Sequence, residues 1–198
     1  MKILILCEES GTVREAFKAR GHDAWSCDLL PSAVPGQHYQ GDALDILKDW
    51  NLIGGKPDII IGHPVCTRRA NSGVRWLNDN PERMGLLRQD DIFFNTLWNC
   101  DIPKICLENP IPHKYSAVPK YTQIVQPYMF GHPESKATCL WLKGLPKLKE
   151  SNNVKKEMML LPKFQQQRIH YLPPSEDRAK IRSKTFSGLA EAMANQWG

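Results

Sequence analysis

The chain has 198 residues, which is long enough for one well-buried domain and short for two. Hydrophobic residues make up 41% and charged residues 24%, as in ordinary globular proteins, and no apolar run approaches the roughly 18 residues of a membrane span. The N-terminus turns acidic at Glu8, too early for the apolar region of a signal peptide. These features predict one globular domain with no membrane partner.

The cysteines indicate a reducing compartment. None of the six lies in a Cys-x-x-Cys pair, and several lie inside apolar runs. Such spacing argues against a zinc site and against a disulfide framework. We therefore expect a cytoplasmic protein without a metal site.

The net charge of +5 is unevenly distributed along the chain. Residues 143–184 hold eleven Lys and Arg but four Asp and Glu, so this basic segment carries +7 and the rest carries −2. One interpretation is a polyanion partner, with nucleic acid as the first candidate. The other is a solvated face with no partner, and the charge pattern alone leaves both open.

The predicted elements alternate between strands and helices. Strands are expected at residues 2–6, 22–27, 58–61, 102–107 and 138–142, and helices at 12–20, 45–51, 83–100 and 188–197. Loops are expected at 30–40 and 112–126, and residues 146–175 show little periodicity. Trp76, Trp98 and Trp141 are interpreted as packing residues. The order predicts an α/β fold with an open, mostly parallel twisted sheet.

The first three elements have the order of a nucleotide-binding βαβ unit. Thr12 is the expected N-cap of the first helix, and Gly21 closes it. Asp28 ends the second strand, where an acid typically bonds a ribose hydroxyl. Only Gly11 is present where the full fingerprint has three glycines, so a simple strand-end cap remains the alternative for Asp28.

A β-branched run marks the centre of the sheet. Residues 58–61 are typical of a parallel strand that is covered on both faces, and Gly62, His63 and Pro64 end it. Cys66 therefore follows the carboxyl end of a strand, where open α/β sheets bind ligands. The alternative is an ordinary buried cysteine. His63 is interpreted as a packing or hydrogen-bonding residue.

A potential acid follows the next predicted strand. Glu108 precedes Asn109 and Pro110, and the separation from Cys66 allows one crossover helix, so the two strands can be neighbours. Alone, Glu108 could be a turn residue, because Asn-Pro favours turns. Arg68 and Arg69, beside the cysteine, could lower its pKa or contact phosphate.

A cysteine and a carboxylic acid at one rim suit a reaction of cytosine. A thiolate that adds to carbon 6, with a proton given to ring nitrogen 3, makes carbon 5 nucleophilic enough to take a methyl group from a sulfonium donor. The reaction also needs a pocket for adenosine, and cations for DNA phosphates, since the base must leave the helix.

Taken together, these blocks resemble DNA (cytosine-5)-methyltransferases, most closely the small bacteriophage-type members, over residues 2–197. The sequence His63-Pro64-Val65-Cys66-Thr67 resembles the Pro-Pro-Cys loop, and Leu107-Glu108-Asn109-Pro110 resembles the Glu-Asn-Val block. Residues 130–136 look like a block that usually ends in arginine, residues 7–11 like the S-adenosylmethionine loop, and residues 182–188 like the closing helix.

The resemblance implies a Rossmann-like class I methyltransferase fold, with residues 1–198 as a single catalytic domain and 143–184 as a basic, loop-rich insertion or DNA-contact segment. It implies S-adenosylmethionine as cofactor, DNA as partner and, for a viral protein, the host cytoplasm. Cys66 would be the nucleophile, Glu108 the acid at nitrogen 3, and Lys136 would lie near the flipped base or its phosphate. The cofactor would be bound by Cys7, Glu8, Glu9, Ser10, Gly11, Asp28, Leu29, Asp42, Ala43, His63 and Pro64.

The sequence departs from the family pattern at several positions. Glu9 occupies a glycine position, Val65 replaces a proline, and Lys136 replaces an arginine fork. The chain also lacks room for a large target-recognition domain, so residues 143–184 or a second subunit, as in a homodimer, would do that work. A catalytically reduced DNA-binding relative and an enzyme that modifies a free pyrimidine nucleotide remain alternatives.

Overall fold

The computed structural model describes residues 1–71, 74 and 81–198 of the chain. The predicted packing residue Trp76 and the Ser72-Gly73 end of the polar loop lie outside these residues. The described strands are β1 (Lys2–Leu6), β2 (Asp23–Asp28), β3 (His38–Gln40), β4 (Ile59–Gly62), β5 (Lys104–Pro110), β6 (Gln123–Val125) and β7 (Thr138–Lys143). The described helices are α1 (Thr12–Lys18), α2 (Ala43–Lys48), α4 (Pro81–Asn99), α5 (Lys155–Leu160), α6 (Lys163–Gln166), α7 (Arg168–Tyr171), α8 (Arg178–Ser183) and α9 (Ser187–Trp197), with 3-10 helices η1 (Trp50–Ile53) and η3 (Pro127–Met129).

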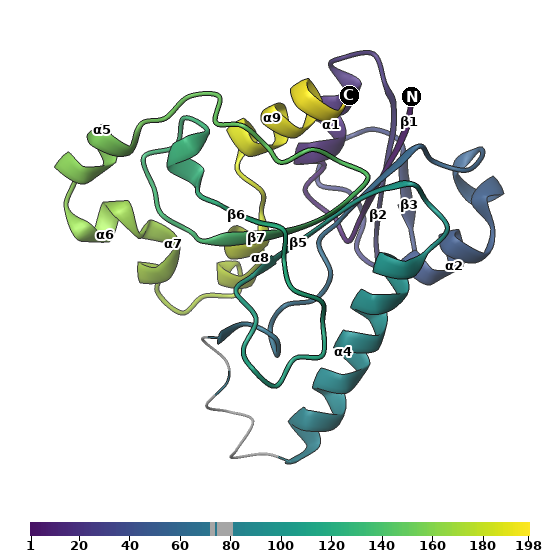
Figure 1. The fold of residues 1–198 in the computed structure, drawn as a ribbon, viewed down its shortest axis with the longest axis horizontal. Coiled ribbons are helices and arrows are strands. Elements are labelled where there is room, and N and C mark those ends of the chain that lie inside the picture. Colours follow the sequence, from purple (N-terminus) through teal and green to yellow (C-terminus); the bar gives the residue numbers. More distant parts are fainter. Residues whose placement is uncertain (72–73, 75–80) are drawn as a thin grey trace.

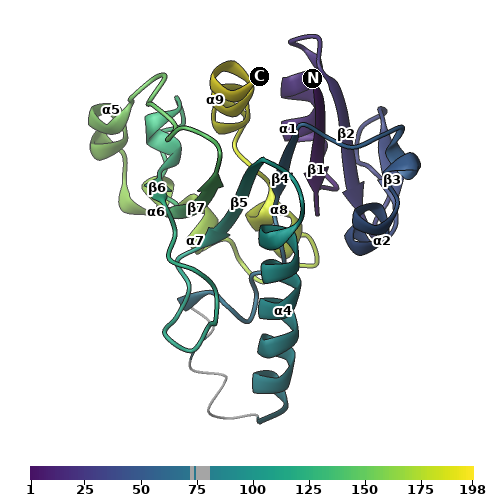
Figure 2. The ribbon, with the colours of Figure 1, turned by 45° about the vertical axis from the view of Figure 1, so that its right-hand side comes forward.

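The strands form one sheet in the order β3-β2-β1-β4-β5-β7-β6 (Figures 1 and 2). Strands β3, β2, β1, β4 and β5 are parallel, whereas β7 pairs antiparallel with both β5 and β6. The strand order reverses direction at β1 and β4, so their carboxyl ends border the switch point, where doubly wound sheets bind ligands. The predicted mostly parallel sheet is confirmed.

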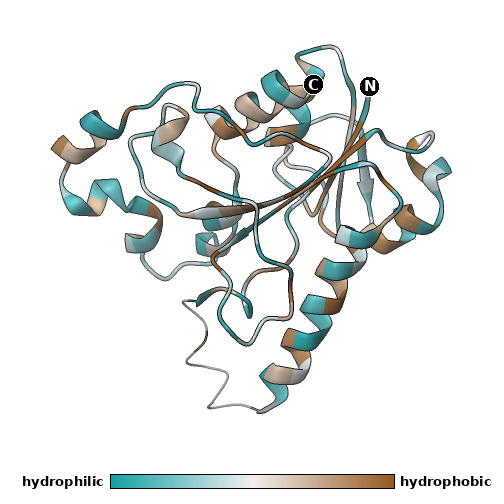
Figure 3. Cartoon of the chain, in the orientation of Figure 1, coloured by the Kyte–Doolittle hydropathy of each residue, from teal (hydrophilic) through white to brown (hydrophobic). Residues whose placement is uncertain are grey.

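Helices cover both faces of the sheet. On one face, α1 and α9 pack over the side chains of Ile3, Ile5 and Ile61. On the other face, α2, η1 and α4 pack over Leu4 and Ile60. Hydrophobic residues are accordingly concentrated along the strands, and the outer sides of the helices are mixed or polar (Figure 3). Burial on both faces explains why the central strands are continuous apolar runs.

Most long elements agree with the sequence predictions, and the differences are local. Gly11, not Thr12, is the N-cap of α1, and Glu8 supplies the missing capping acceptors. The second helix begins at Ala43 because Asp42 caps it, and η1 follows separately. Glu108 lies inside β5, not after it, because antiparallel pairing with β7 extends β5 beyond the end of β4.

Short elements were not predicted. The expected loops contain the three-residue strands β3 and β6, and the expected irregular stretch contains α5, α6 and α7. Each has too few residues to show a period in sequence. Trp141 is fully buried against Phe94, which agrees with its interpretation as a packing residue. Among the described residues, no helix is both long and apolar enough to span a membrane.

Candidate functional site

The loop between β1 and α1 is built around a buried carboxylate. Glu8 is 4% exposed, and its two oxygens accept the backbone N–H groups of Val13 and Arg14 at 2.6 and 3.2 Å. Gly11 has a φ of +68°, and a Cβ there would lie 2.6 Å from a methyl group of Val34. Because the Glu8 carboxylate is committed to α1, this loop offers its backbone, rather than that side chain, to a ligand.

Arg14 fixes the segment between β2 and β3. This side chain is fully buried, and its Nη1 donates to the hydroxyls of Ser26 and Ser32 at 2.9 and 3.1 Å. Its Nη2 donates to the carbonyls of Val34 and Pro35 at 3.0 and 3.2 Å. Sequence reasoning missed this role, because arginine on a short helix is ordinarily exposed. The segment between β2 and β3 is therefore held in place beside the loop that follows β1.

Asp28, predicted to bind the ribose, ends β2, and Asp42, which by the resemblance would face the adenine, follows β3. The Asp28 carboxylate accepts the backbone N–H of Leu30 at 3.0 Å, and Asp42 caps α2 through the N–H of Leu44 at 2.9 Å. Both carboxylates lie close enough to add to the effect of burial in raising the pKa of the Cys7 thiol. Leu29 is 72% exposed, which is unusual for leucine. Two acids and an exposed apolar side chain therefore surround the end of β1.

The loop that carries Cys66 is tied to β5. Asn109 is 2% exposed; its Nδ2 donates to the carbonyl of Pro64 at 2.8 Å, and its Oδ1 accepts from Arg69 at 2.8 Å. The backbone N–H of Arg69 also donates to the carbonyl of Cys66 at 3.0 Å. The position of Cys66 is therefore set by a buried polar network, which compensates for the second proline that this loop lacks.

Arg68 and Arg69 are both bound to acids on α4. Arg68 donates two hydrogen bonds to Asp90, at 2.7 and 2.6 Å. Arg69 is fully buried, donates to Asp91 at 3.0 Å and stacks 4.7 Å from the Phe94 ring centre. Arg69 therefore has no exposed surface for a phosphate, whereas Arg68 is 27% exposed and its contact with phosphate stays a prediction.

Cys66, in the loop after β4, and Glu108, on β5, lie at the same rim of two adjacent parallel strands. Burial raises the pKa of the Cys66 thiol, and the Glu108 carboxylate raises it further, while Lys136 and Arg69 act in the opposite direction. Resting Cys66 is therefore a thiol at neutral pH. Lys136 also lowers the pKa of Glu108, after the larger effect of His63. The three predicted catalytic side chains therefore lie close enough for the charge of each to affect the pKa of another.

His63 pairs directly with Glu108. Its Nδ1 lies 2.8 Å from Glu108 Oε2, and the two side chains are 12% and 10% exposed. Burial lowers the pKa of His63, but the hydrogen bond and charge of Glu108, together with the charge of Glu8, leave it above the ordinary value. Burial raises the pKa of Glu108, but His63 and then Lys136 leave it below the ordinary value. While His63 is protonated, the two groups form an ion pair.

This ion pair predicts how stability depends on pH. The contribution of His63 is fully present below its unfolded pKa and is lost as pH rises through the raised folded pKa. That of Glu108 is present above its unfolded pKa and is lost as pH falls through the lowered folded pKa. Between the two ordinary values, 4.5 and 6.5, both contributions are complete.

We therefore expect His63→Gln to reduce the free energy of unfolding most between these two values, and progressively less at alkaline pH. Urea unfolding of both proteins at about pH 5.5 and about pH 9 measures this difference. A difference that grows toward alkaline pH would contradict the ion pair.

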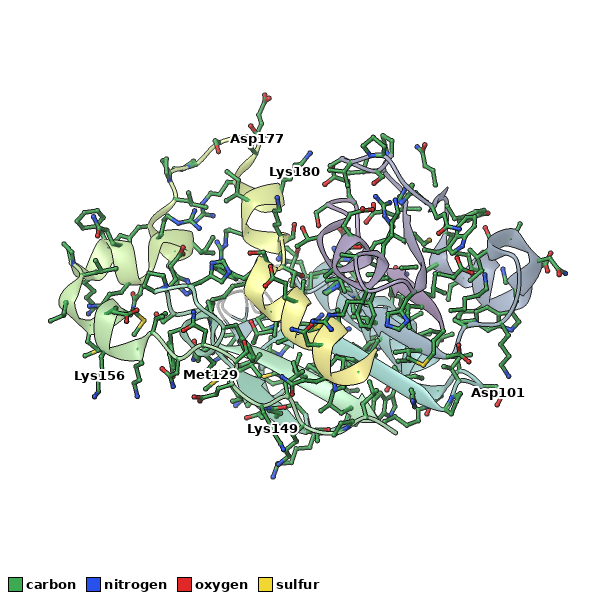
Figure 4. The ribbon with its side chains drawn as sticks, turned by 90° about the horizontal axis from the view of Figure 1, so that it is seen from above. Asp101, Met129, Lys149, Lys156, Asp177 and Lys180 are labelled. Carbon is green, nitrogen blue, oxygen red and sulfur yellow. The ribbon has the colours of Figure 1, made fainter. Side chains whose placement is uncertain are left out.

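The helix α8 joins the basic segment to the predicted donor loop. Lys180 Nζ lies 2.8 Å from Glu9 Oε1, and Lys136 Nζ donates to the carbonyl of Arg182 at 2.8 Å. Figure 4 shows Lys180 extending from α8 toward the N-terminal part of the chain, whereas Lys156 lies at the far end of the molecule. Sequence reasoning did not identify Lys180, because no local pattern links it to Glu9.

The part of the chain that the structure describes contains no candidate metal site. No group of three or more His, Cys, Asp or Glu side chains is arranged there to hold an ion. All six cysteines are free thiols.

The fold is similar to that of a candidate methyltransferase of known structure. A candidate DNA modification methyltransferase encoded within a prophage of E. coli matches at 18% identity and a TM-score of 0.50, over 82% of this chain and 56% of that one. The Entamoeba histolytica methyltransferase EhMeth matches at 14% identity and a TM-score of 0.45, over 77% of this chain and 57% of that one. The sequence matches no family model and no curated protein.

The chain spans a little over half the length of these two structures. At such low identity the likeness concerns the fold alone. The chain therefore has a Rossmann-like methyltransferase fold, with Cys66 and Glu108 at the carboxyl rim of its central strands.

Proposed function

We propose that the protein transfers a methyl group from S-adenosylmethionine to carbon 5 of cytosine in DNA, through a covalent bond between Cys66 and carbon 6. The observation that carries this proposal is the placement of Cys66 and Glu108 at one rim of adjacent parallel strands, beside Lys136. A nucleophile, an acid and a cation in one neighbourhood are the groups that the reaction needs.

The surroundings of β1 fit S-adenosylmethionine in most respects. Asp28, at the end of β2, suits the ribose hydroxyls, exposed Leu29 suits one face of the adenine, and Asp42 with buried Ala43 suits its edge. The backbone of Cys7, Ser10 and Gly11 would border the methionine part. The exception is Glu9, whose carboxylate would repel that of methionine unless Lys180 neutralises it.

Bound S-adenosylmethionine supplies an electrophilic methyl group. Cys66, once it has lost its proton to water, attacks carbon 6 of the ring, and Glu108 passes a proton to nitrogen 3; after methylation, water takes the proton from carbon 5 and the thiolate leaves. Lys136 favours the thiolate through its charge, and the same charge keeps Glu108 ionised until it receives the proton that it passes on. The buried network of Asn109 and Arg69 holds the thiol in place during the attack.

DNA is the substrate that the charge distribution favours. The basic segment 143–184 contains α5, α6, α7 and α8, and most of its Lys and Arg side chains are exposed. Its α8 end contacts Glu9 and Lys136, so cations extend from the proposed site onto the surface. We propose that residues 1–198 act as one catalytic domain in which this segment contacts DNA. We also propose that the protein acts in the cytoplasm.

Mass analysis of nucleosides tests the proposal. DNA incubated with the protein and S-adenosylmethionine is digested, and 5-methyldeoxycytidine is the expected product. Binding of DNA with no product and no heat on titration with S-adenosylmethionine would indicate a catalytically reduced DNA-binding relative. Methylation of free deoxycytidine monophosphate in preference to duplex DNA would indicate a nucleotide-modifying enzyme instead.

The ion pair between Glu9 and Lys180 predicts opposite effects of two substitutions on donor affinity. Glu9→Gln removes a repulsive charge and frees Lys180 for the donor carboxylate, so we expect S-adenosylhomocysteine to bind about two- to fivefold more tightly. Lys180→Met leaves Glu9 unopposed, and binding should weaken by a similar factor of about two to five. Calorimetry measures both constants, and equal effects on methylthioadenosine, which has no carboxylate, would contradict this explanation.

A further inference from the structure

His63 touches the proposed acid but has no part in the reaction described above. Its Nδ1 is hydrogen bonded to Glu108 Oε2 at 2.8 Å, and its Nε2 is buried without a hydrogen-bond partner in the described part of the chain. A buried ring nitrogen without a partner is costly, and in a protonated ring it carries an unsatisfied N–H. The position therefore calls for an explanation beyond packing.

Charges from three elements face this imidazole. Glu108 on β5 and Glu8 in the loop after β1 favour its protonated form, and Lys136, just before β7, opposes it. The unpartnered Nε2 opposes it as well. Burial opposes it most strongly. His63 thus holds a proton against three opposing influences, and a proton held in this way is readily released once the charge of Glu108 is neutralised.

We propose that His63 is a positioning residue that supplies, through Glu108, the proton that nitrogen 3 of the pyrimidine takes up. The proposal rests on the function proposed above. As Cys66 Sγ forms its bond to carbon 6, the displaced π electrons move to nitrogen 3, which takes a proton from the Glu108 carboxyl group.

Because Glu108 is a carboxylate in the resting pair, this proton first moves to Oε2 of Glu108 from Nδ1 of His63, which leaves a neutral imidazole. The Cys66 thiol has lost its own proton to water, and the negative charge of the thiolate and the positive charge of His63 are then both neutralised, so no outside acid is needed. After methyl transfer, water takes the proton from carbon 5, the C–S bond breaks to release the thiolate, and the proton on nitrogen 3 returns to His63 through Glu108.

The test separates proton supply from a structural role. His63→Gln keeps an N–H that can donate to Glu108 but has no transferable proton. We expect kcat to fall by on the order of 100-fold or more while KM for DNA stays within about twofold. The control is His22→Gln, because His22 directly precedes β2 at the amino ends of the strands, opposite to the rim that carries His63, and kcat should not change.

A second measurement needs no catalysis. Nitrogen NMR of the His63 ring should show both nitrogens protonated at about pH 6, and the Glu108→Gln protein should show a lower pKa for this ring. A neutral His63 at that pH, or a wild-type kcat in His63→Gln, would overturn the proposal while leaving cytosine methylation standing. Absence of methylation by the wild-type protein would overturn both.

Discussion

Replacement of Cys66 by alanine is expected to abolish cytosine methylation, with kcat lower by on the order of 10⁴-fold or more. Without the thiol, no bond to carbon 6 forms, and carbon 5 never becomes nucleophilic. The other groups of the site remain, because Asn109 contacts the loop through the carbonyl of Pro64 and the side chain of Arg69, not through the sulfur. Binding of S-adenosylhomocysteine should therefore be unchanged.

The matched control for Cys66→Ala is Cys100→Ala. Cys100 is also half-buried, and burial raises its pKa too, but it lies just after α4 and before β5, at the opposite end of the sheet. Methylation by Cys100→Ala should equal that of the wild-type protein. DNA that contains 5-fluorocytosine adds a direct measurement: a denaturation-resistant complex should form with Cys100→Ala and not with Cys66→Ala. A covalent complex in the absence of Cys66 would contradict its role as nucleophile.

The sequence predicted those parts of the fold that are governed by continuous burial. Strands β1 and β4 are apolar runs because helices cover both faces of the sheet, and β5 is apolar up to Leu107 for the same reason. The neighbouring positions of β4 and β5 followed from the single crossover between them. Strands β3 and β6 were missed because pairing with longer neighbours, not composition, makes them strands.

Side-chain partners in the site were much harder to predict than positions. The order of strands placed Cys66 and Glu108 at one rim, but their closest partners come from distant parts of the chain. Nothing in the local pattern couples Arg68 to Asp90 on α4 or His63 to Glu108. Arg14 was not predicted for a related reason. An arginine ordinarily faces solvent, whereas Arg14 is fully buried and holds the segment between β2 and β3 in place.

Arg69→Met is expected to cause the largest loss of stability, about 3–5 kcal/mol in the free energy of unfolding. Arg69 is fully buried, and methionine fills much of its volume without its charge. The substitution leaves the buried Asp91 carboxylate and the Asn109 carbonyl oxygen without their guanidinium donor. A buried charge without its partner is far more costly than the loss of the same pair at the surface.

The neighbouring Arg68 provides the control, since it forms a shorter ion pair, 2.6 Å against 3.0 Å, in a more exposed place. The side chain of Arg68 is 27% exposed, against 0% for Arg69, so Arg68→Met should cost about 1 kcal/mol or less. Urea unfolding at neutral pH measures both values. Equal losses would mean that the burial of the arginine does not determine how much its ion pair stabilises the protein. A larger loss at Arg69 that disappears when Asp91 is also replaced by asparagine would identify the stranded carboxylate as its cause.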